Sequence, residues 1–281
     1  MSASHDNISP LVTVVTAVWE GDRPRYVAES VSSVLAQTHR ELELIISIDG
    51  MLTDELEDVL AELAEGDARI RTVRSRVNQG PGAARNRAIR EARGSYISIL
   101  DADDVALPER IERQLRFLAQ TNADVAGSFY ELIDGNGRTI GNREVPKSSI
   151  AIRRAMALFN PIANSTVMAR TEVLRDNPFD ESLRYGEDYR LWIHLANAGL
   201  VMRNQPESLV RFRTGAGFVS RRRGWLQLRS DFANKMRALC LWPVLLWPVA
   251  FAGACVTTAA RLLPAPLLRV LYRLRGAMRF S

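Results

Sequence analysis

Short runs of β-branched and apolar residues alternate with helical segments through the first hundred residues of this chain. Strand-like runs occur at residues 11–18, 42–48, 69–73 and 95–100, and apolar residues recur at helical spacing between them. Strands separated by helices of about ten to fifteen residues form right-handed βαβ crossovers, which give a mostly parallel sheet flanked by helices. The pattern therefore predicts an α/β fold whose strand ends meet at one edge of the sheet.

The pattern changes after residue 104, where it predicts an antiparallel excursion. The sequence Asp-Gly-Asn-Gly at 134–137 is a strong turn signal between a strand at 123–133 and a short strand at 138–140. Two helices and two more strands are expected after this hairpin, the helices at 150–158 and 187–198 and the strands at 165–168 and 208–212.

Three carboxylates, those of Asp101, Asp103 and Asp104, follow the apolar run at 95–100. An unpaired carboxylate inside a buried strand is too costly, so we expect all three just past the strand's end, where open α/β sheets bind ligands. A D-x-D pair there offers hard oxygen ligands to a divalent cation that bridges diphosphate oxygens. The alternative is that Asp101 or Asp103 caps the turn and that Asp104 begins the cap of the following helix.

Two other strand ends reach the same edge. The first strand ends near Thr16 and the second at Asp49-Gly50. Both positions are expected to converge with Asp101 because parallel strands end together. Asp49 can accept a hydrogen bond from an N–H group of a nucleotide base. Its alternative role is that of a turn former, which is common for Asp before Gly.

A glycine-bearing loop precedes the helix that carries Arg85. Gly80 and Gly82 permit close approach of an anion to the free N–H groups at the start of that helix. Arg85 adds a fixed charge that can reach phosphate oxygens. The alternative is a solvated helix face, and we assign Arg87 and Arg90 to that face.

The segment GEDYRLWIHLANAG, residues 186–199, predicts an amphipathic helix with an acid at the leading end of its apolar face. That face carries Asp188, Leu191, Trp192 and Leu195 at i, i+3, i+4, i+7 spacing. A carboxylate with restricted solvation and one exposed edge suits a general base. The alternative is that Glu187 and Asp188 only complement the helix dipole.

Composition limits the class of protein. The chain has 281 residues, of which 47% are hydrophobic and 25% are charged, so it is globular rather than disordered. Its two cysteines, Cys240 and Cys255, have no metal-ligand spacing and argue for a reducing compartment. No basic region followed by an apolar region stands at the start of the sequence, so we expect no cleaved secretory signal and a cytoplasmic location.

In the last quarter of the chain, arginine-rich segments alternate with an apolar run. Arginines dominate from Arg203 onward, which favours an anionic partner, either nucleic acid or an anionic membrane surface. Residues 238–260 carry no charge and are long enough to cross a membrane as a helix, and the segment after them has an amphipathic, arginine-rich pattern. We therefore expect a membrane-prone helical appendage. The alternative is a helical hairpin packed on the core.

Together these segments resemble family 2 glycosyltransferases with the GT-A fold. The matching segments cover most of residues 10–213 in the family's order, namely VTVVTAVWEG, SVLAQTHRELELIISIDG, NQGPGAARNRAIREARGSYISILDADD, LPERIERQLRFL, NSTVMARTEVL and FDESLRYGEDYRLWIHLANAG. The resemblance implies a nucleotide-sugar donor, a divalent metal and inversion at the anomeric carbon. It implies that Asp49 reads the base, Asp101 lies near the ribose and metal, Asp103 binds the metal and Asp188 is the base.

Three segments depart from the family pattern. The first strand ends in AVWEG, where the family commonly has a proline, an aromatic residue and an asparagine. The second ends in IDGM, which lacks the usual second aspartate and following serine. In RFRTG, Thr214 stands where many relatives carry a metal-binding histidine, so we expect either that metal binding leans more on Asp103 or that activity is altered.

The sequence thus predicts an inverting glycosyltransferase with a Rossmann-like nucleotide-binding half and an acceptor half. It divides into a tail at 1–9, a GT-A domain at 10–220 and a helical segment at 221–281. The expected donor is a UDP-sugar bound by Thr16, Asp49, Arg85 and Asp101, and the expected cofactor is Mg²⁺ or Mn²⁺ on Asp103, with Asp101 as a second contact.

We expect a glycan or lipid-linked acceptor in envelope polysaccharide or glycolipid synthesis and an anionic membrane surface at the inner face of the cell membrane, with no nucleic-acid partner. One alternative is a catalytically silent nucleotide-sugar-binding subunit that anchors a partner at the membrane. A nucleotidyltransferase is a third reading, for which EGDRPR is a poor match to the loop expected after the first strand.

Overall fold

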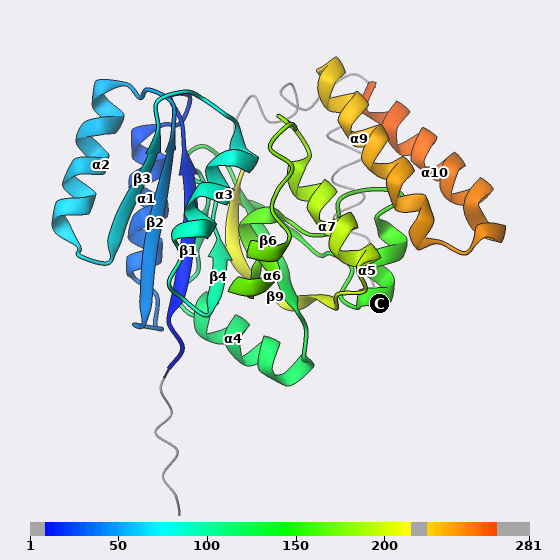
Figure 1. The fold of residues 1–281 in the computed structure, drawn as a ribbon, viewed down its shortest axis with the longest axis horizontal. Coiled ribbons are helices and arrows are strands. Elements are labelled where there is room, and N and C mark those ends of the chain that lie inside the picture. The colour runs from blue at the N-terminus through cyan, green and yellow to red at the C-terminus, as the bar shows by residue number, and fades with distance from the viewer. Residues whose placement is uncertain (1–8, 215–223, 263–281) are drawn as a thin grey trace, which may run out of the picture.

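A mixed sheet of nine strands runs through the part of the protein that the computed structural model describes, residues 9–214 and 224–262. Four parallel strands form its first half in the order β3-β2-β1-β4 (Figure 1). Their bounds are β1 Val12–Val18, β2 Leu42–Asp49, β3 Ile70–Ser75 and β4 Tyr96–Ile99, and the helices between them are α1 Pro24–Leu35, α2 Asp54–Gly66 and α3 Pro81–Glu91. The predicted parallel α/β half is confirmed.

The second half of the sheet is mixed. Its strands continue from β4 in the order β8-β6-β9-β5, and β7 pairs with β6. Their bounds are β5 Val105–Ala106, β6 Val125–Ile133, β7 Thr139–Arg143, β8 Met168–Arg170 and β9 Met202–Arg213. The hairpin of β6 and β7 confirms the turn prediction at 134–137.

Four helices belong to this half: α4 Arg110–Thr121, α5 Ser149–Ala155, α6 Thr171–Asp176 and α7 Glu187–Asn197. The prediction of a strand at 165–168 is wrong for most of its length. Residues Asn164–Thr166 form the 3₁₀ turn η1, and the strand begins only at Met168. Here the Thr166 side chain hydrogen-bonds the carbonyl oxygen of Ala163, a local contact that competes with strand pairing.

Two apolar layers cover the sheet because successive strand side chains point to opposite faces. Val14 and Leu44 pack in a cluster with residues of α1, α2 and α4. Their neighbours Val15 and Ile45 pack on the other face with residues of α3, α6 and α7. The helix that carries Arg85 and the helix that begins with Glu187 and Asp188 therefore lie on the same face of the sheet.

The C-terminal described residues fold back on themselves. They form α9 Trp225–Ala238, two 3₁₀ turns (η2 Leu239–Leu241 and η3 Val244–Leu246), α10 Trp247–Ala259 and the turn η4 Ala260–Leu262. Pro243 separates the turns and Pro248 lies in the first turn of α10, so the uncharged run at 238–260 does not form one helix.

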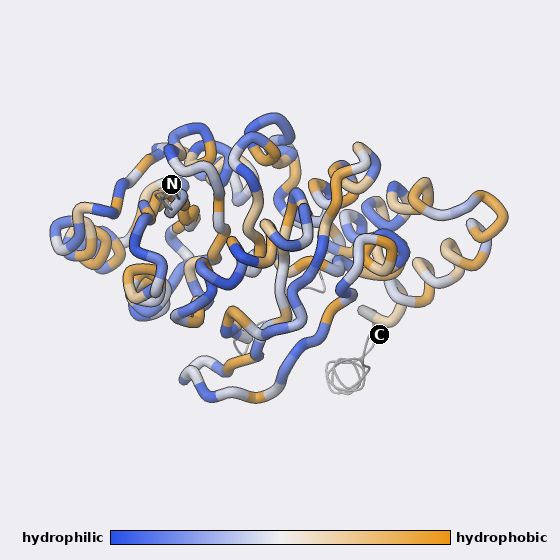
Figure 2. The backbone as a smooth tube through the Cα atoms, turned by 90° about the horizontal axis from the view of Figure 1, so that it is seen from below, coloured by the Kyte–Doolittle hydropathy of each residue, from blue (hydrophilic) through white to orange (hydrophobic). Residues whose placement is uncertain are grey.

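No helix of the described residues is long and apolar enough to cross a membrane. The 13 residues of α10 span roughly 20 Å, against a hydrocarbon core of about 30 Å. The predicted membrane-prone appendage thus finds no support here. The alternative of a helical hairpin within 238–260 is met only in part, because that run supplies the two turns and α10, and the partner of α10 is α9, which precedes the run (Figure 2). The predicted amphipathic segment after residue 262 and the arginines at 221–223 lie outside the described residues.

A buried lysine holds this hairpin together. Lys235 Nζ lies 2.7 Å from Asp231 Oδ2 on α9 and donates to the hydroxyls of Thr257 and Thr258 on α10, each at 3.0 Å. Only 1% of the Lys235 side chain and 5% of the Asp231 side chain are exposed. The two helices are therefore joined by the ammonium group of Lys235, which is paired with Asp231 on α9 and donates to hydroxyls on α10.

Candidate active site

The turn after β4 does not present three equivalent acids. Asp104 is 1% exposed, and its Oδ1 accepts a hydrogen bond of 2.7 Å from the backbone N–H of Arg213 at the end of β9. Burial raises the pKa of Asp104 well above its usual range, and the nearby charges of Asp103 and Asp101 raise it further. Asp104 thus joins the turn to β9, and the alternative that Asp104 begins the cap of the following helix is wrong, because α4 has Glu109 as its N-cap.

Asp101 is the acid of this turn that the neighbouring residues orient. Its Oδ1 accepts hydrogen bonds from Arg85 Nη2 at 2.8 Å and from Asn164 Nδ2 at 3.0 Å. About a third of its side chain, 31%, stays exposed. The carboxylate is therefore held in place by two donors while it keeps an open side.

Arg85 joins the two halves of the site. Its guanidinium contacts Asp101 and also Glu187 Oε1, at 2.6 Å, and its side chain is 9% exposed. The predicted role of Arg87 and Arg90 on a solvated face holds for Arg90, whereas Arg87 Nη1 donates to Ser47 and to the carbonyl of Ile48. Arg85 thus fixes the end of β4 against the start of α7.

Glu187 is buried in this network. Burial, opposed by the charge of Arg85 and reinforced by that of Asp188, raises the pKa of Glu187 to about 7. The same two carboxylates, Asp101 and Glu187, raise the pKa of Arg85 against the cost of its burial. Glu187 therefore does more than complement the helix dipole, and sequence reasoning gave it no other role.

Asp188 lies at the start of α7, next to this network. Its Oδ2 accepts a hydrogen bond of 2.8 Å from Asn160 Nδ2, and the residue is half-buried. The apolar face behind it is as predicted, because Leu191, Trp192 and Leu195 are buried in the core. The structure thus brings Asp188, Arg85 and Asp101 to one edge of the sheet.

Asp49 is more enclosed than expected. It is 4% exposed, and its carboxylate oxygens accept hydrogen bonds from the backbone N–H groups of Gln79 (3.0 Å) and Gly80 (2.7 Å). Its strand, β2, is separated from β4 by β1, so two strand spacings of about 4.8 Å each separate the strand of Asp49 from the strand that leads to Asp101. In this arrangement Asp49 anchors the loop before α3, and base recognition stays a prediction.

The end of β1 contributes an aromatic residue. Thr16 lies within β1 at 1% exposure, so its hydroxyl is closed to solvent. Trp19, just beyond the strand, is 46% exposed, and its ring covers Gly21 so closely that a Cβ there would lie 2.3 Å from it. Trp19 thus offers a flat apolar surface at the edge where the strands end, from the AVWEG segment that departs from the family pattern.

The residues fit a divalent cation held partly by a nucleotide. Within residues 9–214 and 224–262, no group of three or more His, Cys, Asp or Glu side chains could hold a metal by itself. A nucleotide-bound Mg²⁺ or Mn²⁺ takes one or two carboxylates from the protein and other ligands from phosphate and water, which Asp101 and Asp103 match. The charges of Asp103 and Asp101 add to the burial that raises the pKa of Asp104, and this repulsion among the acids favours such a cation.

Thr214 does not replace the metal-binding histidine of relatives in this arrangement. Its backbone N–H and its hydroxyl both donate to the carbonyl of Ile133 on β6, at 2.8 and 3.1 Å. The preceding Arg213 instead contacts the acidic turn, because its Nε donates to the carbonyl of Asp103 at 2.8 Å.

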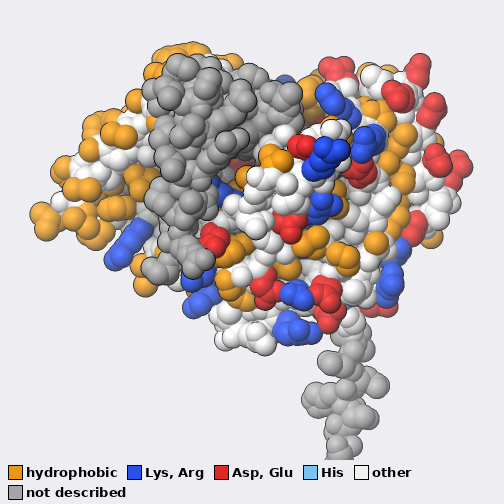
Figure 3. All heavy atoms as spheres, turned by 180° about the vertical axis from the view of Figure 1, so that it is seen from behind, with side chains coloured by type: hydrophobic (Ala, Val, Ile, Leu, Met, Phe, Trp, Pro, Cys, Tyr) orange, Lys and Arg blue, Asp and Glu red, His pale blue; other side chains and the backbone are white. Residues whose placement is uncertain are grey.

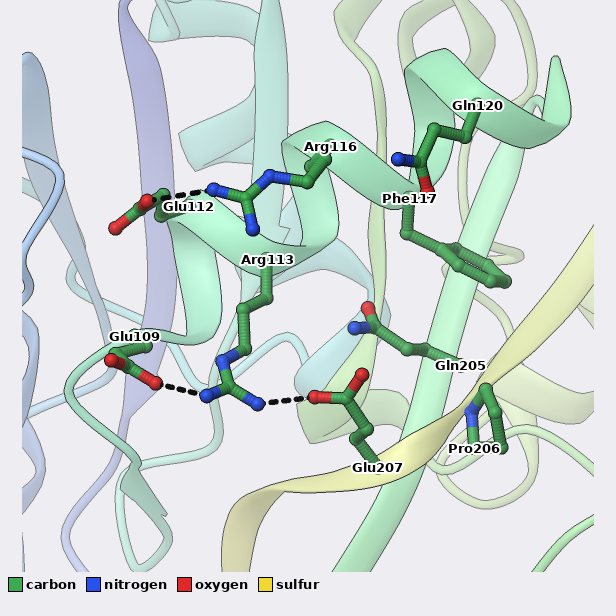
Figure 4. A pocket seen from close by; sticks show the side chains of 9 residues that line it. All are labelled: Glu109, Glu112, Arg113, Arg116, Phe117, Gln120, Gln205, Pro206 and Glu207. Carbon is green, nitrogen blue, oxygen red and sulfur yellow. Dashed lines mark hydrogen bonds and ion pairs between the residues drawn. The ribbon is translucent and has the colours of Figure 1, made fainter.

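Sequence reasoning missed two asparagines of the site, Asn160 and Asn164. Asn164 stands in the NST segment that matched the family, but an asparagine just before a predicted strand carries no signal of a partner 63 residues away. A different pocket, of about 400 Å³, lies between α4 and the kink of β9 and shares no residue with this site (Figure 4). Its Arg113 is paired with Glu109 and Glu207, so its main charges are already satisfied.

Comparison with known proteins gives the family of this chain. Residues 13–180 match the sequence model of the family described as "Glycosyl transferase family 2". An uncharacterized glycosyltransferase of Haemophilus influenzae is 31% identical over 93% of this chain and 97% of its own length. The uncharacterized glycosyltransferase MJ1057 of Methanocaldococcus jannaschii is 29% identical over 93% and 92%. The amylovoran biosynthesis glycosyltransferase AmsE of Erwinia amylovora is 26% identical over 79% and 83%.

Solved structures share the fold. S. aureus TarS 1–349 in complex with UDP-GlcNAc superposes with a TM-score of 0.61 at 16% identity, over 96% of this chain and 94% of that one. The mannosyltransferase PcManGT of Pyrobaculum calidifontis, in complex with GDP-Man and Mn²⁺, gives 0.61 at 16% identity over 96% and 81%. These likenesses show a GT-A-like fold, with a mixed sheet and flanking helices.

A parallel α/β half joined to a mixed half, with acids gathered where the strands end, is the GT-A architecture found in glycosyltransferases. With the match over residues 13–180, the chain belongs to glycosyl transferase family 2.

Proposed function

We propose that this protein is an inverting glycosyltransferase that moves a sugar from a nucleoside diphosphate to a hydroxyl group, with Asp188 as general base. The observation that carries the proposal is the pair of contacts made by Arg85, to Asp101 at 2.8 Å and to Glu187 at 2.6 Å. Through these contacts one buried side chain holds the acids of the donor side against the first turn of α7, which bears Asp188.

The chemistry follows from that placement. The acceptor hydroxyl oxygen bonds to the anomeric carbon, the bond from that carbon to the diphosphate oxygen breaks, and the nucleoside diphosphate leaves. The hydroxyl proton passes to Asp188, whose other partner, Asn160, donates to Oδ2. Attack opposite the leaving group inverts the anomeric centre. A half-buried carboxylate held in this way is suited to the proton transfer.

The donor side is assigned to Asp49, Arg85 and Asp101, with Asp103 as the main metal contact. Mg²⁺ or Mn²⁺, when bound there, offsets the charge that develops on the departing diphosphate. The solved relative bound to GDP-Man and Mn²⁺ supports a divalent cation, and the one bound to UDP-GlcNAc supports a nucleotide-sugar donor, for which we favour UDP.

For the acceptor we propose a glycan or lipid-linked glycan of the cell envelope. The relatives named for amylovoran and teichuronic acid biosynthesis support this class of acceptor. The exposed apolar side chains on the C-terminal hairpin support contact with the surface of a membrane, at its cytoplasmic face, without a spanning helix. Figure 3 shows hydrophobic side chains gathered over that hairpin, at the left.

The test is a turnover assay with a panel of UDP-, GDP- and dTDP-sugars, each with and without Mn²⁺. We expect one class of donor to release its nucleotide, and to do so only when both Mn²⁺ and an acceptor are present. Asp188→Asn is expected to lower turnover on the order of a hundredfold or more while the affinity for the donor is kept. Transfer by Asp188→Asn at the wild-type rate would show that Asp188 is not the base.

A further inference from the structure

The helix α9 contacts the start of the helix that carries Asp188. Asn234 is fully buried, and its Nδ2 donates to the carbonyl of Gly186 at 2.9 Å while its Oδ1 accepts from Arg190 Nε at 2.7 Å. Arg190 can only donate, so the amide of Asn234 has a single orientation, with its NH₂ group toward Gly186. Ser230, one turn earlier on α9, donates to the carbonyl of Tyr185 at 2.6 Å.

These contacts fix the two carbonyls that immediately precede Glu187 and Asp188. Gly186 is the N-cap of α7 and has a φ of +69°, a conformation that residues with a Cβ rarely adopt. A Cβ at this position would also lie 2.9 Å from Asn234 Nδ2. The close approach of α9 and the left-handed residue therefore set together how the first turn of α7 enters the site.

From this geometry we infer that Asn234, with Ser230, is a positioning residue for the general base. Asn234 touches neither substrate nor metal and acts by holding the carbonyl of Gly186, which orients the turn that bears Asp188. The inference rests on the proposed role of Asp188. It also gives the C-terminal hairpin a function in catalysis, because the segment expected to serve as a separate membrane appendage supplies this contact.

Substitutions of Asn234 in the full-length protein test the inference. Asn234→Asp keeps an oxygen for Arg190 but places a second oxygen against the carbonyl of Gly186, whereas Asn234→Ala removes both contacts. We expect both variants to lower kcat for sugar transfer roughly 10- to 100-fold, the scale of a misplaced catalytic group. The Kd of UDP with Mn²⁺, measured by calorimetry, is expected to stay within about twofold, because the side chain of Asn234 bonds Gly186 and Arg190, and neither is assigned to the donor.

Arg229→Ala, an exposed position on the same helix, is the matched control and should keep the wild-type kcat. Wild-type kcat in Asn234→Asp would overturn the inference, since the contact with Arg190 would then be sufficient. A parallel loss of UDP affinity and kcat would overturn it too, because α9 would then support the whole fold. If Asp188→Asn itself keeps full activity, the proposed base is wrong. That result tests the proposed function, whereas the Asn234 variants test the inference drawn here.

Discussion

At the scale of single residues, charge balance within the buried network decides the behaviour of the site. Arg85 is shared by Asp101 and Glu187, and Asp188 follows Glu187 directly. Removing one partner of a buried ion pair leaves an uncompensated charge, which is costly. The arrangement therefore constrains all four side chains, and each can be probed by a change that keeps its shape.

The stability contribution of Glu187 is expected to depend on pH. Burial raises the pKa of Glu187 from 4.5 to about 7, so the folded state holds its proton more tightly than the unfolded chain. Its contribution to the free energy of unfolding is then complete below a pH of about 4.5 and is lost as the pH rises to about 7. Glu187→Gln lacks this dependence. Urea unfolding across that range should show the wild type losing stability relative to the variant.

A surface acid provides a control of opposite sign. The hydrogen bonds from Arg74 lower the pKa of Glu57, so its contribution is present at neutral pH and is lost as the pH falls.

Wild-type and Glu187→Gln curves that stay parallel between about pH 4.5 and 7 would contradict the assignment of a buried proton to Glu187.

Asp103→Asn is expected to abolish metal-dependent nucleotide binding. The change keeps the shape of the side chain but removes a charged ligand from a metal site with few protein ligands. Calorimetry of UDP with and without Mn²⁺ measures the effect: the gain in affinity from Mn²⁺ should disappear in the variant. An unchanged gain would show that Asp103 is not a metal ligand.

At the scale of elements, the ion pair in the C-terminal hairpin is expected to decide whether α10 stays on α9. Lys235→Met leaves Asp231 buried without its cation, and we expect a loss of about 3–5 kcal/mol. The double variant Lys235→Met, Asp231→Leu removes both charges and should recover most of that loss. Chemical unfolding of the two variants gives the comparison, and equal instability in both would mean that packing, not charge, joins the helices.

Elements with a repeating apolar pattern were predicted well. The strands β1, β2 and β4 and the helices α1, α3 and α7 follow from β-branched runs and helical spacing, because each must bury one face. The segment at 164–166 and the C-terminal run were not predicted, for different reasons. In the first, the Thr166 hydroxyl donates to the carbonyl of Ala163, and the second is divided by Pro243 although the whole run is uncharged.

At the scale of the whole molecule, we expect the hairpin to bring the protein to anionic vesicles. Leu245 and Val249 are 88% and 65% exposed, and burial of such a side chain is worth about 1.5–3 kcal/mol. The double variant Leu245→Glu, Val249→Glu should therefore reduce flotation with vesicles that contain anionic lipid by roughly tenfold or more. Salt alone should release little of the wild-type protein.

Ile140→Glu is the matched control, since Ile140 is 58% exposed on β7, far along the chain from the hairpin. Equal flotation of the hairpin variant and the wild type, or no flotation of folded wild-type protein, would show that these side chains do not contact lipid.

The sequence by itself determined the parallel half of the sheet and placed Asp49, Asp101 and Asp188 next to strand ends or a helix start. It could do so because these features depend on local periodicity and on the rule that parallel strands end at one edge. Tertiary structure alone decided which acids are available. The carboxylate of Asp104 accepts a hydrogen bond from Arg213, which lies 109 residues further along the chain. The carbonyl of Gly186, at the start of α7, accepts one from Asn234, which lies 48 residues further along. No local pattern carries such partners, because hydrogen bonds across the fold depend on distances that only the packed chain sets.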